Sequence, residues 1–147
     1  MDLGSQLAYG CRRCVAGEEA GMKQEDTRAF AEQWATAWNE RAVERVLAHF
    51  RDDVIFTSPT AQTVMGKATV RGKEALREYW NKALARIGSL RFTVDRVLWD
   101  ASSRELVIIY VSELNGRRKR VSENLRFDVE GLVESAEVFH GAEELGE

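Results

Sequence analysis

A chain of 147 residues without a long low-complexity stretch is expected to fold as one domain, large enough to bury most of its apolar surface in a single core. Its formal net charge is -3, and basic and acidic residues are interleaved along it, so no large positive field is present to bind nucleic acid or an anionic membrane surface. The chain also lacks a run of about twenty apolar residues to cross a bilayer and the apolar core of a secretory signal, so we expect a soluble cytoplasmic protein without a membrane partner.

The only two cysteines, Cys11 and Cys14, form a C-x-x-C in the leader, residues 1–21. This spacing is typical of a redox pair or of half a zinc site. Zinc would need further ligands, for which the chain offers only His49 and His140, and a thioredoxin-like pair should open a helix after a strand. We therefore expect an incidental motif, no metal site and no cofactor.

Three amphipathic helices are predicted before the first long strand. The first begins near Glu25, the second stops at Asp52 and Asp53, and the third lies between Gly72 and Gly88. Their apolar positions are Phe30, Trp34 and Trp38 in the first, Val43, Val46, Leu47 and Phe50 in the second, and Leu76, Tyr79, Trp80, Ala83 and Ile87 in the third. This i, i+3, i+4 spacing gives each helix one apolar face for packing on a sheet.

Strands are predicted between the helices and throughout the carboxyl-terminal part. Val54–Ser58 is a β-branched and aromatic run that ends at Pro59, which has no N–H for a ladder. The later strands are expected at Leu90–Trp99, Glu105–Leu114, Arg117–Asp128 and Leu132–His140. The fold class is therefore α+β, with three N-terminal helices packed on a curved antiparallel sheet.

The dipeptide Asn115-Gly116 predicts a two-residue hairpin and fixes its register, because both positions of that turn favour positive φ. If Leu114 faces Arg117, one side of the sheet carries the pairs Ser112 with Lys119, Tyr110 with Val121 and Ile108 with Glu123. The other side carries Val107, Ile109 and Val111. Since both sides are apolar, we expect helices and a pocket to cover one and a second subunit to cover the other, giving a homodimer through the outer face of the sheet.

Glu123 is the strongest candidate for chemistry, because it alternates in step with apolar residues and should point inward. Desolvation raises the pKa of a buried carboxyl group and suits it to proton transfer near neutral pH. Tyr110 lies diagonal to it, where the hydroxyl could orient the acid or donate to a ligand. The structural alternatives are a carboxylate satisfied by a buried tyrosine or tryptophan, one at the wet end of the strand, and an ordinary core tyrosine.

His140 lies on the same side of the last predicted strand as the residues expected to point inward. Histidine is the side chain most easily poised for proton transfer at neutral pH. A capping role at a frayed strand end is the alternative. His49 is expected instead to be a solvated residue at a helix end.

The three tryptophans Trp34, Trp38 and Trp80 either pack in the core or line a cavity for a flat apolar ligand. The other residues expected at the pocket are Phe56, Ser58, Ile108, Ser112 and Val138. No catalytic triad order, H-E-x-x-H, phosphate loop or calcium loop is present in the sequence.

Five motifs carry a resemblance to a known family. They are W-x-x-x-W-N at Trp34–Asn39, D-D-V-x-F-x-S-P at Asp52–Pro59, G-K-E-A-L-R-E-Y-W at Gly72–Trp80, E-N-L-R-F-D-V-E-G at Glu123–Gly131 and V-F-H-G at Val138–Gly141. Through them the stretch from Phe30 to Phe139 resembles the SnoaL-like branch of the nuclear-transport-factor-two-like superfamily. The resemblance implies a cone-shaped α+β barrel with an internal pocket, and dimers through the outer face of the sheet.

Relatives in this superfamily include isomerases, dehydratases, epoxide hydrolases, polyketide cyclases and non-catalytic binding domains, so the fold does not determine the function. The resemblance to ketosteroid isomerases places their general base at Ser58, their protonated acid at Glu123 and their tyrosine donor at Trp34. Serine at the base position departs from that pattern. The aspartate, arginine, aspartate set of epoxide hydrolases of this fold is not found.

Two functions follow from these features. The first is a cofactor-independent enzyme acting on a small hydrophobic molecule, cyclic or carbonyl-bearing. Its groups would be Glu123 as acid or base, Tyr110 and Trp34 as hydrogen-bond donors, and His140 as proton shuttle. The second is a binding or association module, which the serine at position 58 favours. We expect the domain to span residues 22–141, with Met22 as the native start, a dispensable leader and an acidic tail at 142–147.

Overall fold

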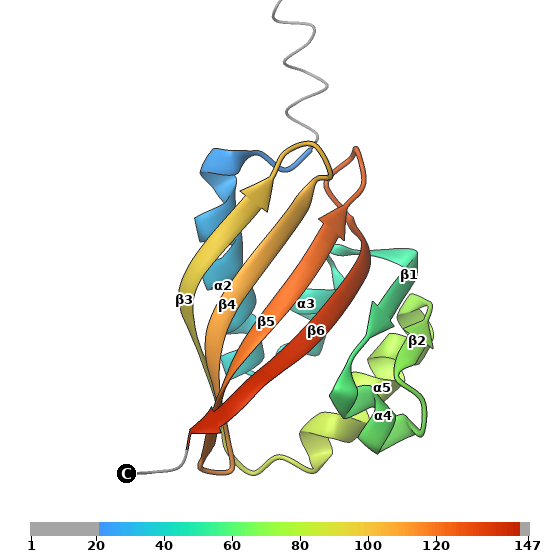
Figure 1. Ribbon diagram of the computed structural model, residues 1–147. Helices are drawn as coiled ribbons and strands as arrows, with labels where there is room; N and C mark the ends of the chain where they lie inside the picture. Colours follow the sequence, from blue (N-terminus) through green and yellow to red (C-terminus); the bar gives the residue numbers. More distant parts are fainter. Residues whose placement is uncertain (1–20, 145–147) are drawn as a thin grey trace, which may run out of the picture.

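The structure is a computed structural model that describes residues 21–144 (Figure 1). The C-x-x-C motif and the rest of the leader before Gly21 lie outside the described residues, as do residues 145–147 of the expected tail. The helical segments are η1 (Gln24–Asp26), α2 (Thr27–Asn39), α3 (Val43–Leu47), α4 (Pro59–Met65) and α5 (Lys73–Ala85), and the strands are β1 (Phe50–Thr57), β2 (Thr69–Arg71), β3 (Leu90–Asp100), β4 (Glu105–Leu114), β5 (Arg117–Phe127) and β6 (Val133–Glu144).

The first and third predicted helices are confirmed as α2 and α5. Helix α2 buries the face that carries Phe30, Trp34 and Trp38, with alanines between them that let the helix approach the sheet closely. At its end, the Asn39 side chain donates to the backbone oxygen of Phe92 at 3.0 Å and accepts from the Phe92 N–H at 2.7 Å. These two hydrogen bonds attach the helix to the edge strand β3.

The second predicted helix is shorter than expected. Helix α3 ends at Leu47, and β1 already begins at Phe50, where we expected helix to continue to Asp52. Phe50 is buried, but it belongs to strand β1, so its agreement with the helical spacing is a coincidence. A short apolar run does not by itself distinguish helix from strand.

The segment between Pro59 and Gly72, for which we predicted no helix or strand, contains one of each. Pro59 occupies the first turn of α4, and the Ser58 side chain caps that helix by accepting from the Thr60 N–H at 3.1 Å. Gly66 ends it in the left-handed conformation at φ 84. Strand β2 then pairs with β1 antiparallel.

The six strands form one mixed sheet in the order β2-β1-β6-β5-β4-β3. All neighbouring pairs are antiparallel except β1 and β6, which run parallel, so the prediction of a purely antiparallel sheet was wrong. Strands β2 and β3 lie at the two ends of this order, and the sheet does not close into a barrel. The α+β class is confirmed, with four α-helices on the sheet.

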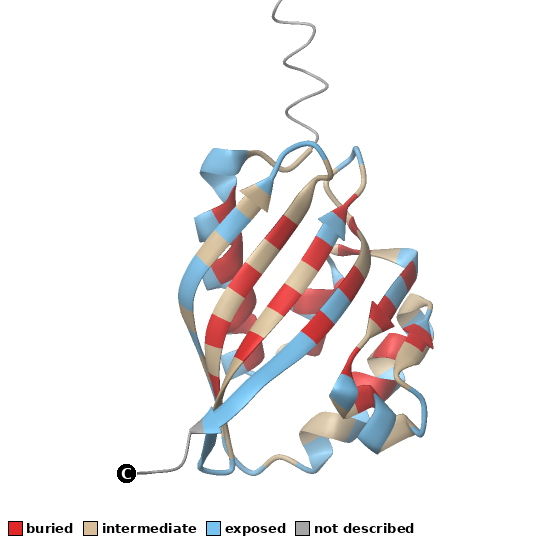
Figure 2. Cartoon of the chain, viewed as in Figure 1, coloured by how far each residue is buried: buried red, intermediate tan, exposed pale blue. Residues whose placement is uncertain are grey.

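Every cross-strand residue pair predicted for the β4–β5 hairpin is confirmed. Leu114 faces Arg117 and Ile108 faces Glu123. Asn115 and Gly116 have φ values of 53 and 84, as the turn requires. Inward positions of these two strands are buried and outward positions are mostly half-buried, which gives the banding along β4 and β5 in Figure 2.

Strand β6 continues past His140 to Glu144, so His140 is not at a frayed strand end. The β5–β6 register shifts between Lys119 and Val121, opposite Gly141. A Cβ atom at Gly141 would lie 2.9 Å from the backbone oxygen of Arg120. The bulge therefore needs glycine at this position for close approach of the two backbones.

The core lies between the sheet and the helices, and Figure 1 shows α2 and α3 behind the strands β3 to β6. Met22 is partly buried and packs against this core. Within the described residues, no helix is long and apolar enough to cross a membrane.

Candidate active site

A cavity of about 140 Å³ lies between the helices α2 and α5 and the inner face of β4, β5 and β6. Its buried part is lined by Trp34, Trp38, Phe56, Ser58, Tyr79, Trp80, Tyr110, Ser112, Val121, Glu123 and Val138. Its more accessible part is lined by Thr60, Ala83, Leu84, Ile87, Leu90, Phe92, Leu114, Lys119 and His140. The walls are mainly apolar and a few polar groups converge on the interior, which is typical of a small-molecule site.

Aromatic rings form the helical side of the cavity and its junction with the sheet. The rings of Trp34 and Tyr110 meet edge to face with centroids 4.9 Å apart, and Trp34 stacks on Phe92 at 5.7 Å. Trp38 and Trp80 meet edge to face at 4.8 Å. Both interpretations of the tryptophans therefore hold in part, since each packs on neighbouring aromatic rings and also lines the cavity.

Glu123 and Tyr110 form the polar centre of the cavity. The Tyr110 Oη donates to Glu123 Oε1 at 3.2 Å, and both residues are buried. The two side chains reach each other diagonally across the β4–β5 pair, since Tyr110 faces Val121 and Glu123 faces Ile108.

Burial raises the pKa of the Glu123 carboxyl group from 4.5 to about 7, while the hydrogen bond from Tyr110 acts in the opposite direction. Burial, together with the neighbouring Glu123, raises the pKa of Tyr110 well above its usual value. Near neutral pH, Glu123 can therefore hold or release a proton, whereas Tyr110 stays protonated and can only donate or accept a hydrogen bond.

Tyr79 brings a second phenol to the cavity from α5. Burial raises its pKa to about 12, although hydrogen bonding with the side chains of Ser58 and Thr60 offsets part of this effect. Glu123 also raises the pKa of Tyr79, so the two groups share one electrostatic environment. Sequence reasoning placed Tyr79 only on the apolar face of its helix and missed it at the cavity.

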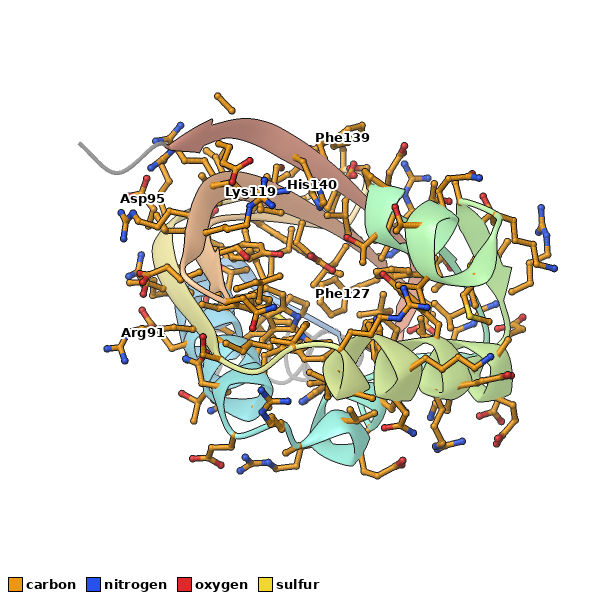
Figure 3. All side chains as sticks on the ribbon, turned by 90° about the horizontal axis from the view of Figure 1, so that it is seen from below. Arg91, Asp95, Lys119, Phe127, Phe139 and His140 are labelled. Carbon is orange, nitrogen blue, oxygen red and sulfur yellow. The ribbon has the colours of Figure 1, made fainter. Side chains whose placement is uncertain are left out.

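Lys119 and His140 lie at the accessible end of the cavity. Figure 3, viewed from the end where the β4–β5 turn lies, shows them side by side under β6, with Phe139 on the opposite side of that strand. The Lys119 Nζ and the His140 Nδ1 are 3.4 Å apart. Burial, and then the charge of Lys119, lower the pKa of His140, so the imidazole is neutral at neutral pH.

The structure brings ten of the eleven residues expected at the site to one cavity: Trp34, Trp38, Phe56, Ser58, Trp80, Tyr110, Ser112, Glu123, Val138 and His140. Ile108, the eleventh, is completely buried and is not among the lining residues. Sequence reasoning also missed Phe92 and Lys119 as cavity residues. The alternation of inward and outward residues that identified Tyr110 and Glu123 also places Lys119 on the inner side of the sheet. Lys119 could therefore have been predicted at the cavity from the sequence.

His49, expected at a solvated helix end, is half-buried and meets Phe30 edge to face at 5.0 Å. Burial lowers its pKa. Within residues 21–144, no group of three or more histidine, cysteine, aspartate or glutamate side chains is arranged to hold a metal ion.

Several solved structures are similar to this chain. A SnoaL-like protein of unknown function from Burkholderia thailandensis is 26% identical with a TM-score of 0.73, and the match covers 83% of this chain and 99% of that one. A candidate ketosteroid isomerase from Kribbella flavida is 22% identical with a TM-score of 0.64, covering 84% and 83%. SalBIII is an epoxide hydrolase/cyclase-like enzyme with a role in pyran ring formation in the polyether salinomycin. It is 18% identical with a TM-score of 0.64, and the match covers 82% of this chain and 95% of SalBIII.

The two less similar structures support the fold alone, and none of the curated proteins matches the chain. Residues 31–136 match the family model of the SnoaL-like domain, which covers more than half of the sequence. This chain therefore belongs to the SnoaL-like domain family.

Proposed function

We propose that this protein is a cofactor-independent enzyme that transfers a proton to or from a small hydrophobic substrate, cyclic or carbonyl-bearing, bound in a cone-shaped pocket. The observation that carries the proposal is the buried pair of Tyr110 and Glu123, joined at 3.2 Å in an aromatic cavity. A carboxyl group whose pKa is about 7 can act as acid or base at neutral pH without a metal or cofactor.

Each polar group at the cavity would have a separate role. As a carboxylate, Glu123 would remove a proton from carbon or oxygen; as an acid, it would protonate a developing oxyanion. Tyr110 would hold the carboxyl group in place and donate to it. His140, neutral and at the accessible end, would exchange protons with water.

The apolar walls would bind the ring system of the substrate. Trp34, Trp38, Trp80 and Phe56 provide flat surfaces, and Ser112 and Val138 line the same cavity. An isomerase, cyclase, dehydratase or hydrolase of this type would need no group beyond these. The similarity to a candidate ketosteroid isomerase and to an epoxide hydrolase/cyclase-like enzyme is consistent with such substrates.

Proton transfer can be tested before the substrate is known. A panel of cyclic ketones with α-hydrogens is incubated with the protein in D₂O, and deuterium uptake is followed by mass spectrometry. We expect uptake into at least one ketone to exceed both the buffer rate and the rate with Glu123→Gln. Glu137→Gln, at an exposed position of the neighbouring strand, is the matched control and should keep the activity. Ketones that bind without any exchange would contradict the enzymatic proposal.

One observation favours a second function, a non-catalytic ligand-binding module. Ser58, at the position where the resemblance places a catalytic base, uses its Oγ to cap α4 at Thr60. Its hydroxyl is therefore engaged in local structure, and among the described residues Glu123 is the one that brings a carboxyl group to the cavity. In such a module, Glu123→Gln would weaken ligand binding, whereas in the enzyme it would abolish turnover and spare affinity.

We also propose that the protein is a homodimer through the outer face of the sheet. Leu98 and Phe139 are each 53% exposed on this face, and Val107, Ile109 and Val111 are half-buried between them. Because the helices cover only the inner face, a second copy would bury this apolar area.

A further inference from the structure

The accessible end of the cavity holds a cation, Lys119, beside a carboxylate that is paired with another residue. Lys119 is half-buried and lines the cavity, and among the side chains of residues 21–143 its Nζ forms no ion pair with a carboxylate. Its cross-strand neighbour is Glu143. That carboxylate is bound by Arg117, whose Nε and Nη2 lie 2.7 Å and 3.0 Å from its two oxygens. Arg117, and to a smaller degree the charge of Lys119, lower the pKa of the Glu143 carboxyl group. Because Arg117 makes the direct ion pair, the Lys119 ammonium group still has its donors available at the cavity.

The neighbouring histidine uses little of the hydrogen-bonding capacity of this ammonium group. Lys119 can donate one N–H to the neutral His140 at Nδ1, 3.4 Å away. An ammonium group carries three donors, so two remain. The Nε2–H of the same histidine tautomer is a further donor at this end of the cavity.

Ser112, the cross-strand neighbour of Lys119, is polar, and most of the other residues at this end are apolar. Leu84, Ile87, Leu90 and Leu114 line the accessible part of the cavity together with Lys119 and His140. A ligand that passes this end thus meets both aliphatic side chains and a cation. This combination fits an amphipathic molecule rather than a wholly apolar one.

The spacing along β5 separates the cation from the proposed acid. Lys119 and Glu123 both face the cavity and are four residues apart, which is about 13 Å along a strand. Val121 lies between them and adds an apolar stretch to the wall. One elongated molecule can therefore place its anionic group at Lys119 while its ring reaches the Tyr110–Glu123 pair.

We propose that Lys119, with His140 beside it, binds the carboxylate of an amphipathic ligand whose apolar body fills the cavity. This inference rests on the proposed function in taking the cavity as the ligand site, but it does not require catalysis. A carboxylate is favoured over a phosphate because a single ammonium and a neutral imidazole match one negative charge.

The test uses 4-cyclohexylbutanoate and its neutral counterpart, 4-cyclohexylbutanamide. Neither probe absorbs where tryptophan does, so fluorescence of the cavity indoles reports binding of both. We expect the wild-type protein to bind the acid about tenfold more tightly than the amide at low salt, as a charge-assisted hydrogen bond would give. Lys119→Gln should bring this ratio near one without weakening the amide, and Lys119→Arg should retain a preference for the acid.

Lys67→Gln makes the same charge change at an exposed position away from the cavity and should leave the ratio unchanged. An acid preference that persists in Lys119→Gln would overturn the carboxylate subsite, while leaving proton transfer at Glu123 untouched. Equal affinities of the two probes for the wild-type protein, or binding of neither, would overturn it as well. Loss of deuterium exchange in Glu123→Gln tests the other proposal independently.

Discussion

The Tyr110 hydroxyl and the Glu123 carboxyl group meet at 3.2 Å on adjacent strands, and both are buried. The pair lies where the sheet, α2 and α5 enclose one cavity. Because burial destabilises the carboxylate, the position of the Glu123 proton depends on pH in the range where proteins normally work. Stability, proton transfer and ligand binding are therefore linked at this side chain.

The stability of the protein should depend on pH through the Glu123 carboxyl group. The pKa of Glu123 is about 7 in the folded protein against 4.5 as its ordinary value, so the folded state retains a proton that the unfolded chain releases. Stability associated with this proton is present in full below pH 4.5 and is lost as pH rises towards about 7. We expect the free energy of unfolding to fall by up to about 3 kcal/mol across this window.

Glu123→Gln isolates this contribution, because glutamine is a neutral isostere of the protonated acid. Denaturant unfolding at a series of pH values should show the variant gaining on the wild type between pH 4.5 and 7. Glu137→Gln, on the exposed side of β6, corrects for the amide substitution itself. A constant difference between Glu123→Gln and wild type over this window would mean that Glu123 does not titrate there.

Tyr110→Phe should raise the pKa of Glu123 further. The phenol donates to the carboxyl group and favours its charged form, so removing the hydroxyl leaves burial unopposed. We also expect a loss of about 1 kcal/mol in the free energy of unfolding. Carbon-13 NMR of the side-chain carboxyl group measures the pKa. Tyr79→Phe, in the same cavity, is the control and should have the smaller effect; a larger one would show that Tyr79 is the main partner.

Gly141→Ala should disturb the bulge that positions His140. The new Cβ would lie 2.9 Å from the Arg120 backbone oxygen, so one of the two strands must shift. We expect a loss of about 1 to 3 kcal/mol in unfolding free energy and displaced His140 ring signals in NMR spectra. At Gly66 a Cβ would meet no atom within 4 Å, although its φ of 84 disfavours alanine. Gly66→Ala is the control and should leave the His140 signals unchanged. Unchanged His140 signals in Gly141→Ala would contradict the prediction, because they would mean that the strands adapt to the new Cβ.

If the outer face of the sheet is a dimer interface, sedimentation velocity should show a dimer at micromolar concentration. Ile109 lies in the middle of this face, opposite Ser122 of β5, and is half-buried in the single chain. Ile109→Glu should give a monomer that remains folded by circular dichroism, because the side chain points away from the core. Thr36→Glu, at an exposed site of α2 on the other side of the sheet, is the control that should stay dimeric. A wild-type monomer would contradict the interface.

Local signals in the sequence predicted the hairpin and the inward residues well. Asn115 and Gly116 fix the β4–β5 pairing through their backbone conformation, and strand parity then places Tyr110 and Glu123 on the same side. Both inferences need only neighbouring residues. The Ser58-Pro59 pair also carried a helix-capping signal for α4, which we read as a strand end.

Long-range features were not predictable in the same way. The parallel pairing of β1 with β6 joins segments separated by most of the chain, and no turn specifies it. Strand β2 spans only Thr69–Arg71, too short for a recognisable alternation. The contact between Lys119 and His140 also depends on the β5–β6 register, which shifts at the bulge and could not be derived from alternation alone.

The most direct test of the account is a titration of the Glu123 carboxyl carbon in the wild-type protein by carbon-13 NMR, with Glu123→Gln to assign the signal. A buried acid poised for proton transfer should titrate with a midpoint near pH 7. A midpoint near 4.5, the ordinary value of a glutamate, would show a carboxylate exposed to water and would contradict acid-base chemistry at this site.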